Sequence, residues 1–137
     1  MCLDLEATLY QEYAKLIKTF FESLADTKMF EYIEKEFSEE LLENEKILAV
    51  VFYASYCPFC KKFSKILEKY YFEGKICFAK ADISDDNSPY WSRYSIEVVP
   101  TIIVFRGKKV VDRCDGVLGR GIDEKVLASL LDRVLKG

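Results

Sequence analysis

Apolar residues recur along the chain in two patterns, one typical of helices and one typical of buried strands. Residues 3–24 place apolar side chains at steps of three and four, which predicts an amphipathic helix that Asp4 could cap. Residues 46–54, KILAVVFYA, and residues 75–83, KICFAKADI, are continuous apolar runs of strand length. Such runs are expected of strands that are buried on both faces of a sheet.

The segments around these two runs predict shorter elements. We expect a short strand at 29–33, a charged helix at 34–45, a helix with an apolar stripe at 59–71, a short helix within 85–99, strands at 101–107 and 108–116 joined by a tight turn, and a last helix capped by Asp123. Strands that alternate with helices predict an α/β domain with a mainly parallel sheet and helices on both faces. The final hairpin adds an antiparallel edge, and its second strand is polar enough for an edge position.

Two cysteines, Cys57 and Cys60, lie between a predicted buried strand and a predicted helix, in the sequence YCPFCK. Catalytic sites of such sheets lie beyond the carboxyl ends of the strands, which is where this pair lies. At a helix start, Cys57 faces unpaired backbone N–H groups and the positive end of the helix dipole, and both favour the thiolate. Pro58 suits the first helical position, and Cys60 returns to the same face one turn inward. The pattern predicts thiol–disulfide exchange, with Cys57 as nucleophile and Cys60 as resolving thiol.

Composition narrows the alternatives for this pair. The chain has five cysteines and no histidine, which excludes Ser-His and Cys-His catalysis and any metal site that contains histidine. Zinc usually needs four ligands, and the chain has no second CxxC, so we expect no metal. An iron–sulfur or zinc site shared across a dimer stays open as an alternative. We expect Cys77 to be a buried packing residue, Cys114 an unremarkable strand residue and Cys2 a free thiol.

Charge and hydropathy limit the partners. A net charge of −3 argues against nucleic acid or an anionic membrane as a main partner, because both need a basic surface. No apolar run is long enough to span a bilayer, and we see no signal-peptide pattern, so the expected location is the cytoplasm. In that reducing compartment a CxxC pair is more often catalytic or metal-binding than structural.

The sequences YASYCPFCKKF and VVPTIIVF, in this order of elements, resemble the thioredoxin family. The resemblance covers about residues 28–137 and leaves residues 1–27 as an amphipathic helical extension. It implies a thioredoxin-like fold and a protein-disulfide oxidoreductase without a cofactor, whose active pair forms the redox disulfide Cys57–Cys60. Implied partners are protein disulfides and a thioredoxin-reductase-like or glutathione-type electron donor. We expect a monomer or a weak dimer.

The resemblance also implies roles for single residues. Pro100 is then a cis proline that faces the cysteines, and the backbone of Val99 can pair with a bound peptide. Beside the motif residues Pro58 and Phe59, it implies substrate-binding roles for Tyr56, Val99, Pro100, Thr101 and Trp91, and a possible proton-transfer role for Lys80.

Two departures affect the chemistry. Cys-Pro-aromatic-Cys is similar to glutaredoxins, so a glutathione-linked reductase remains an alternative. Val51 stands where thioredoxins carry a buried aspartate, which puts a proton relay through that acid in doubt. Because Phe59 adds no charge, we expect a reducing protein and not a strong oxidant.

Overall fold

The computed structural model describes residues 29–43, 47–74 and 76–136 of the chain. The helical extension predicted for 1–27, with its Cys2, lies outside these residues, and so does its boundary with the domain. No helix in the described part is long and apolar enough to span a membrane.

The centre of the domain is a mixed sheet in the order β2-β1-β3-β4. Strand β1 (Ile47–Tyr53) pairs in parallel with β2 (Cys77–Asp82), whereas β3 (Thr101–Arg106) runs antiparallel to β1, and β4 (Lys109–Asp115) antiparallel to β3. The mixed sheet is confirmed. The expectation of a mainly parallel sheet is wrong for these four strands, because β3 returns along β1 in the opposite direction. The predicted polar edge strand is confirmed, since β4 is the most exposed of the four.

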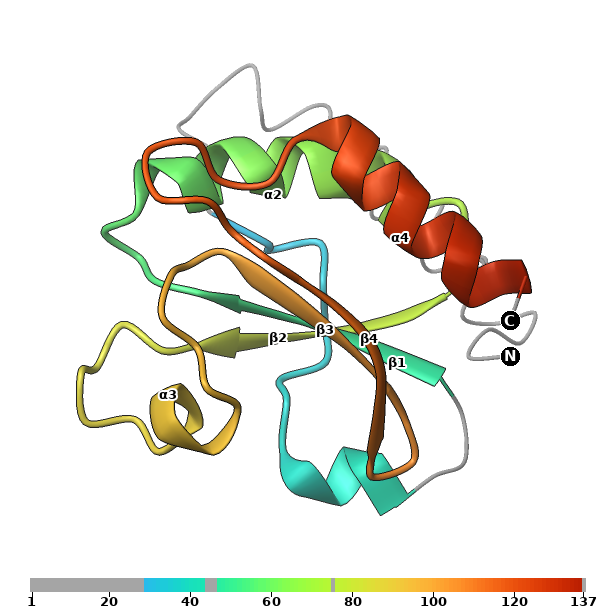
Figure 1. Ribbon diagram of the computed structural model, residues 1–137, viewed down its shortest axis with the longest axis horizontal. Coiled ribbons are helices and arrows are strands. Elements are labelled where there is room, and N and C mark those ends of the chain that lie inside the picture. The colour runs from blue at the N-terminus through green and yellow to red at the C-terminus, as the bar shows by residue number, and fades with distance from the viewer. Residues whose placement is uncertain (1–28, 44–46, 75, 137) are drawn as a thin grey trace.

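Helices cover both faces of the sheet (Figure 1). Helices α2 (Pro58–Tyr71) and α4 (Glu124–Lys136) lie side by side on one face, and α3 (Tyr90–Arg93) and the 3-10 helix η1 (Glu39–Glu43) lie on the other. Alternate residues of β1 point to opposite faces, so Val51 packs under α2 while Phe52 packs toward α3. Each face therefore has its own apolar cluster.

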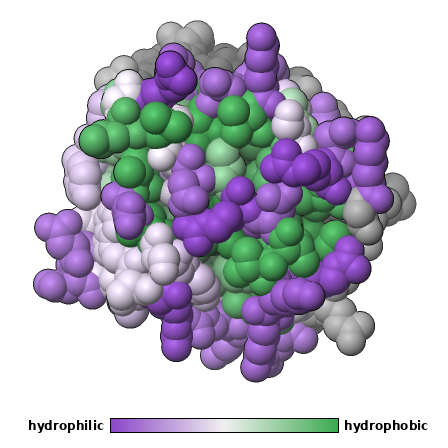
Figure 2. Space-filling view, in the orientation of Figure 1, coloured by the Kyte–Doolittle hydropathy of each residue, from purple (hydrophilic) through white to green (hydrophobic). Residues whose placement is uncertain are grey.

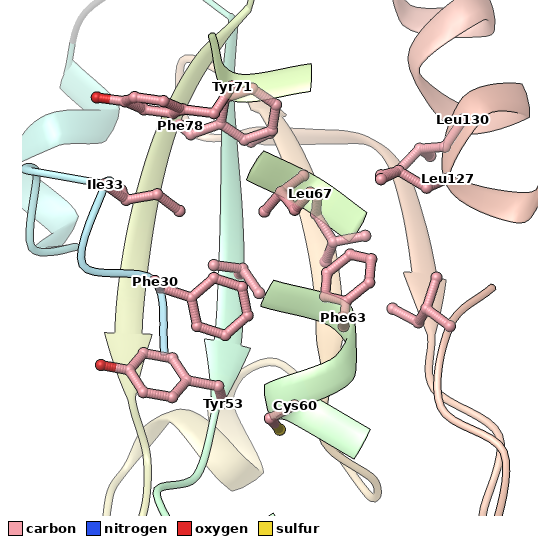
Figure 3. Close-up of a cluster of buried hydrophobic side chains, with 14 of the residues drawn as sticks. Phe30, Ile33, Tyr53, Cys60, Phe63, Leu67, Tyr71, Phe78, Leu127 and Leu130 are labelled. Atoms are coloured by element: carbon pink, nitrogen blue, oxygen red, sulfur yellow. The ribbon is translucent and has the colours of Figure 1, made fainter. Parts of the chain in front are cut away.

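The two clusters differ in content. Under α2 and α4, Phe63, Leu67 and Leu127 reach the sheet together with Cys60 (Figure 3). On the other face aromatic rings dominate, and Phe37 contacts Phe52, Tyr90, Tyr94 and Phe105 with ring centroids 5.4–6.1 Å apart. The cluster under α2 contains Cys57 and Cys60, and the cluster on the other face contains Cys77.

The segment before β1 departs from the expectations. Residues 29–33 form a turn and no strand, because Phe30 takes a left-handed φ of 57° and buries its ring completely. Its N–H donates to Ser64 Oγ on α2 at 2.8 Å, which fixes this turn against the helix. The sheet-like contact comes later, as a parallel bridge between Glu36 and Lys80. Within the described residues, the helix expected at 34–45 is reduced to η1.

Candidate active site

The end of β1 and a tight turn place the CxxC motif. After β1 the buried Ala54 is followed by a turn that the Cys57 N–H closes by donating to the Ala54 carbonyl at 3.1 Å. Cys57 has the extended backbone of an N-cap residue, with φ −93° and ψ 114°, and α2 begins at Pro58. The expected placement of the motif at a strand end and a helix start is confirmed, and it follows from the proline at the first helical position.

The two sulfurs lie one behind the other, with Cys57 as the front group toward the surface and Cys60 as the rear group in the core. The Cys60 N–H donates to Cys57 Sγ at 3.4 Å, and the Cys57 thiol donates to the Val99 carbonyl at 3.5 Å. Cys57 is 9% exposed and Cys60 is fully buried, and both are free thiols. The turn around Val99 covers most of Cys57, but of the two cysteines only Cys57 keeps exposed surface that a partner can reach.

Burial decides the protonation of the rear cysteine. Desolvation, and then the neighbouring Cys57, raise the pKa of the Cys60 thiol well above its ordinary value, and the hydrogen bond to the Ala54 backbone offsets this only in part. Figure 3 shows Cys60 at the end of a row with Phe63 and Leu67, facing the sheet. Cys60 is therefore a neutral thiol at neutral pH.

The turn before β3 closes the site from the opposite side. The Val99–Pro100 peptide bond is cis, as the resemblance implied. Pro100 and Thr101 are buried, and the Thr101 hydroxyl donates to the Val98 carbonyl at 2.6 Å. Thr101 thus stabilises the turn by this internal hydrogen bond, while the Val99 carbonyl lies against Cys57.

A glycine-containing segment, the 116–121 loop, completes the site and was missed by the sequence reasoning. A Cβ on Gly116 would lie 2.4 Å from the Pro100 carbonyl oxygen, and one on Gly121 would lie 3.0 Å from Phe59 Cβ. Gly121 also has a φ of +77°, which favours glycine. Three glycines within six residues, at 116, 119 and 121, were the available signal. This loop packs between the cis-proline turn and the start of α2.

Apolar side chains at the rim of the site are open to solvent. Tyr56 is 63% exposed, Val117 53% and Leu118 86%. Figure 2 shows apolar groups over the connection between β4 and α4, which contains the last two residues. Tyr53, three residues before Tyr56, belongs to the core beside Phe30.

Trp91 lies on α3, packed against the aromatic cluster on the other face of the sheet. Its indole N–H donates to the Ile83 and Asp85 carbonyls, both at 3.2 Å. These bonds fix the loop that follows β2, and this loop in turn contacts the motif, because the Ser55 N–H donates to Ser84 Oγ at 2.7 Å.

Lys80 lies directly beside Val51 in the parallel β1–β2 pairing. Its Nζ donates to the Phe30 carbonyl at 3.2 Å and lies 3.8 Å from Glu36 Oε1. The lysine is mostly buried, with 15% of its side chain exposed, whereas the Glu36 side chain is 71% exposed. Because Val51 is apolar, Lys80 is the mostly buried charged group at this position of the β1–β2 pair.

The remaining described cysteines lie in strands. Cys77 is buried in β2 as expected, but it is disulfide-bonded, so its interpretation as a packing residue alone is corrected. Cys114 is partly buried in β4, where burial and then Asp115 raise the pKa of its thiol. In the described ranges, no three side chains of His, Cys, Asp or Glu are grouped to hold a metal ion.

Comparison with known proteins gives consistent matches. The thioredoxin family model matches residues 28–129. Thioredoxin of Chlorobaculum thiosulfatiphilum is 34% identical over 100 residues, 72% of this chain and 92% of that protein. The crystal structure of thioredoxin from Trypanosoma brucei brucei has a TM-score of 0.61 and 25% identity, over 72% of this chain and 82% of that one. A chain of a ferredoxin:thioredoxin reductase and thioredoxin f2 complex has a TM-score of 0.61 and 20% identity, over 73% and 93% of the two chains.

Proposed function

Because the chain belongs to the thioredoxin family and is a thiol–disulfide oxidoreductase that acts on proteins, we propose that its reaction runs through Cys57 and Cys60. The observation that carries this proposal is the front-and-rear arrangement of the pair. Cys57 keeps 9% of its surface exposed whereas Cys60 keeps none, and Cys57 Sγ receives the N–H of Cys60. Cys57 is therefore the nucleophile and Cys60 the resolving thiol.

The reaction takes place in two exchanges that balance. The Cys57 thiolate attacks one sulfur of the partner's disulfide, and the other partner sulfur leaves as a thiolate that takes up a proton. The Cys60 thiol then loses its proton, and its sulfur attacks Cys57 Sγ in the mixed disulfide. The second partner sulfur leaves and is protonated, so the partner gains two electrons and two protons while the Cys57–Cys60 disulfide forms.

In the second exchange the proton that Cys60 loses passes, through solvent, to the partner sulfur that leaves Cys57. We assign Lys80 to assist this transfer, because it is the mostly buried charged group beside Val51. As an ammonium held by the Phe30 carbonyl and Glu36, it acts by stabilising the thiolate that forms. Lys80→Met keeps the length of the side chain and should slow resolution of the mixed disulfide more than its formation.

Partner binding uses the groups around Cys57. An extended peptide is proposed to pair with the backbone of Val99, where the cis-proline turn brings the chain to the cysteine. Tyr56 supplies exposed apolar contact area. Pro58 and Phe59 shape the helix start, Pro100 and Thr101 hold the turn, and Trp91 acts through the loop after β2.

Electron supply is proposed to come from a reductase of the thioredoxin-reductase type, with a glutathione-type donor as the alternative that the CPFC motif favours. Support comes from the fold shared with a chain of the ferredoxin:thioredoxin reductase and thioredoxin f2 complex.

We propose a net reducing direction, because an uncharged Phe59 does not add to thiolate stabilisation. We also propose a cytoplasmic location, because dithiol reduction suits a reducing compartment. A reduction potential near about −120 mV would contradict the reducing direction.

Reduction of insulin disulfides in the presence of dithiothreitol tests the assignment. The wild type should turn over, Cys57→Ser should lose turnover, and Cys60→Ser should accumulate mixed disulfides that mass spectrometry detects. Cys114→Ser is the matched control, since that thiol lies on β4 outside the motif. Equal turnover in the wild type and in both motif variants would end the proposal.

A further inference from the structure

The exposed face of α2 carries positive charge immediately after the active cysteines. Lys61, Lys62 and Lys65 are all exposed and follow Cys60 within two helical turns. Arg120 is also exposed and belongs to the 116–121 loop, which packs against Phe59 at the start of the same helix. We call these four side chains the α2 cation face. Their shared position next to Cys57 makes them neighbours of any bound partner.

These four cations have no acidic partner within the part of the chain that the structure describes. Among the residues that the structure describes, none of the four takes part in an ion pair. Lys69, farther along the same helix, does, because its Nζ lies 2.6 Å from Glu124 Oε1. The α2 cation face therefore keeps its charge available to an external group.

The opposite side of the motif has the opposite charge. Asp82, the last residue of β2, and Asp85 and Asp86 in the loop that follows it are exposed. This loop is held beside the motif, because the Ile83 N–H donates to the Tyr53 carbonyl at 2.8 Å and the Ser55 N–H donates to Ser84 Oγ. Cys57 is thus flanked by cations on one side and by carboxylates on the other, within a chain whose net charge is −3.

We propose that the α2 cation face selects, for reduction by Cys57, protein disulfides whose reactive cysteine lies beside a cluster of carboxylates. The inference rests on the proposed exchange at Cys57 and adds the class of partner. Clustered surface charge next to a binding site raises the association rate of an oppositely charged partner by long-range attraction. A merely solvated lysine surface would leave the rate independent of the partner's charge.

Three synthetic peptides with the same disulfide loop and with glutamate, serine or lysine flanks test the proposal, with dithiothreitol as the recycling reductant. At low ionic strength, kcat/KM of the wild type should be about tenfold higher for the glutamate peptide than for the lysine peptide. The difference should vanish near about 1 M salt, where the screening length is about 3 Å. The triple variant K61E/K62E/K65E should reverse the order of the glutamate and lysine peptides.

A matched triple variant controls for net charge. Arg106, Lys108 and Lys109 are exposed at the β3–β4 hairpin, at the end of the sheet opposite to the motif. R106E/K108E/K109E changes the net charge by the same amount and should keep the wild-type order. If the control changes the order as much as the α2 variant does, or if the wild type reduces all three peptides equally, the proposal is wrong.

The serine peptide separates this inference from the function on which it rests. If the wild type fails to reduce any of the three peptides, the proposed exchange fails. If it reduces the serine peptide but shows no charge preference, only the role of the α2 cation face fails. Should K61E/K62E/K65E not fold, K61Q/K62Q/K65Q replaces it and should abolish the preference without reversing it.

Discussion

Helices α2 and α4 pack on the same face of the sheet, yet they begin in different ways. At the start of α4, Asp123 Oδ1 accepts the N–H of Val126 at 2.9 Å, which confirms the predicted cap. At the start of α2, Cys57 Sγ accepts the N–H of Cys60 at 3.4 Å. In each helix the cap accepts the N–H three residues ahead, but sulfur is a weaker acceptor than a carboxylate.

The difference shows that the N-cap position stabilises the helix in α4, whereas in α2 it holds a reactive group. A strong cap at Cys57 would satisfy the helix start with an oxygen that cannot exchange a disulfide. A thiol at this position forms a weaker cap hydrogen bond, but it places a nucleophile where backbone N–H groups converge. Local rules of helix formation are often relaxed in this way at functional sites.

Cys57→Asp should separate the two roles most sharply. Disulfide reduction should fall by about a thousandfold or more, because a carboxylate does not replace the sulfur in exchange. The free energy of unfolding of the reduced protein should be equal or higher, because aspartate is a preferred N-cap. Insulin reduction and urea unfolding measure the two quantities.

Cys57→Ala is the control for this substitution. It should lose the activity equally and also lose about 1 kcal/mol of stability, because alanine cannot cap. If Cys57→Asp is as unstable as Cys57→Ala, Cys57 does not act as the cap of α2.

The sequence predicted both helices and the motif because these depend on local patterns. The apolar stripes of α2 and α4 and the continuous runs of β1 and β2 appear within one segment each. The turn at Phe30 could not be predicted, because its partner Ser64 lies 34 residues away. Local pattern also indicated Cys57 and Cys60, whereas Pro100 was indicated by the resemblance to the thioredoxin family.

Gly116 and Gly121 belong to the candidate site for a reason that no local pattern contains. Their importance comes from the close approach of two distant segments, Pro100 and Phe59. The lysines of the α2 cation face were visible in the sequence, but the sequence did not show that they form no ion pair with the other described residues. Predictions from sequence therefore covered the reacting groups better than the surfaces around them.

Gly116→Ala tests whether the 116–121 loop, which leads into α4, also positions the chemistry of α2. The added Cβ would lie 2.4 Å from the Pro100 oxygen, so the 116–121 loop and the cis-proline turn have to shift relative to each other. A displacement of about 1 Å can cost up to about a hundredfold in rate, and we expect kcat/KM for insulin reduction to fall at least about tenfold.

Gly119→Ala is the matched control in the same loop. No atom lies within 4 Å of its added Cβ, but its φ of +80° should lower the free energy of unfolding by about 1–2 kcal/mol. Exchange rates at a temperature where this variant is folded should match the wild type. If both variants reduce insulin equally well, the contact between Gly116 and Pro100 does not position the site.

The pH dependence of stability should reveal the buried thiol of α2, for which α4 has no counterpart among its buried residues. Burial raises the pKa of Cys60 above its ordinary value of 9.0, so the folded protein holds this proton more tightly than the unfolded chain. The resulting stability is fully present below pH 9 and is lost as the pH rises. The slope is at most about 1.4 kcal/mol per pH unit for one proton.

Urea unfolding of the reduced protein at about pH 8 to about pH 10 measures this slope, with Cys60→Ser as the control. Tyr53, whose pKa burial raises to about 12, adds a slope of the same sign at about pH 10, but Cys60→Ser carries the same contribution, so the difference between the two proteins reports on Cys60. Wild type and Cys60→Ser should diverge as the pH rises above 9. Parallel curves would mean that Cys60 carries no raised pKa.

Asp123→Ala should have the smallest effect of these substitutions, and it should lower stability without changing activity. Loss of the hydrogen bond to the Val126 N–H should lower the free energy of unfolding by about 1 kcal/mol, because alanine leaves this N–H without its cap. The insulin reduction rate should stay at the wild-type value, since the cap of α4 contacts neither Cys57 nor the cis-proline turn. Asp123→Ser, which can cap, should recover most of the stability. A drop in activity without a drop in stability would show that the start of α4 also serves the chemistry, and the contrast between the two helices would not hold.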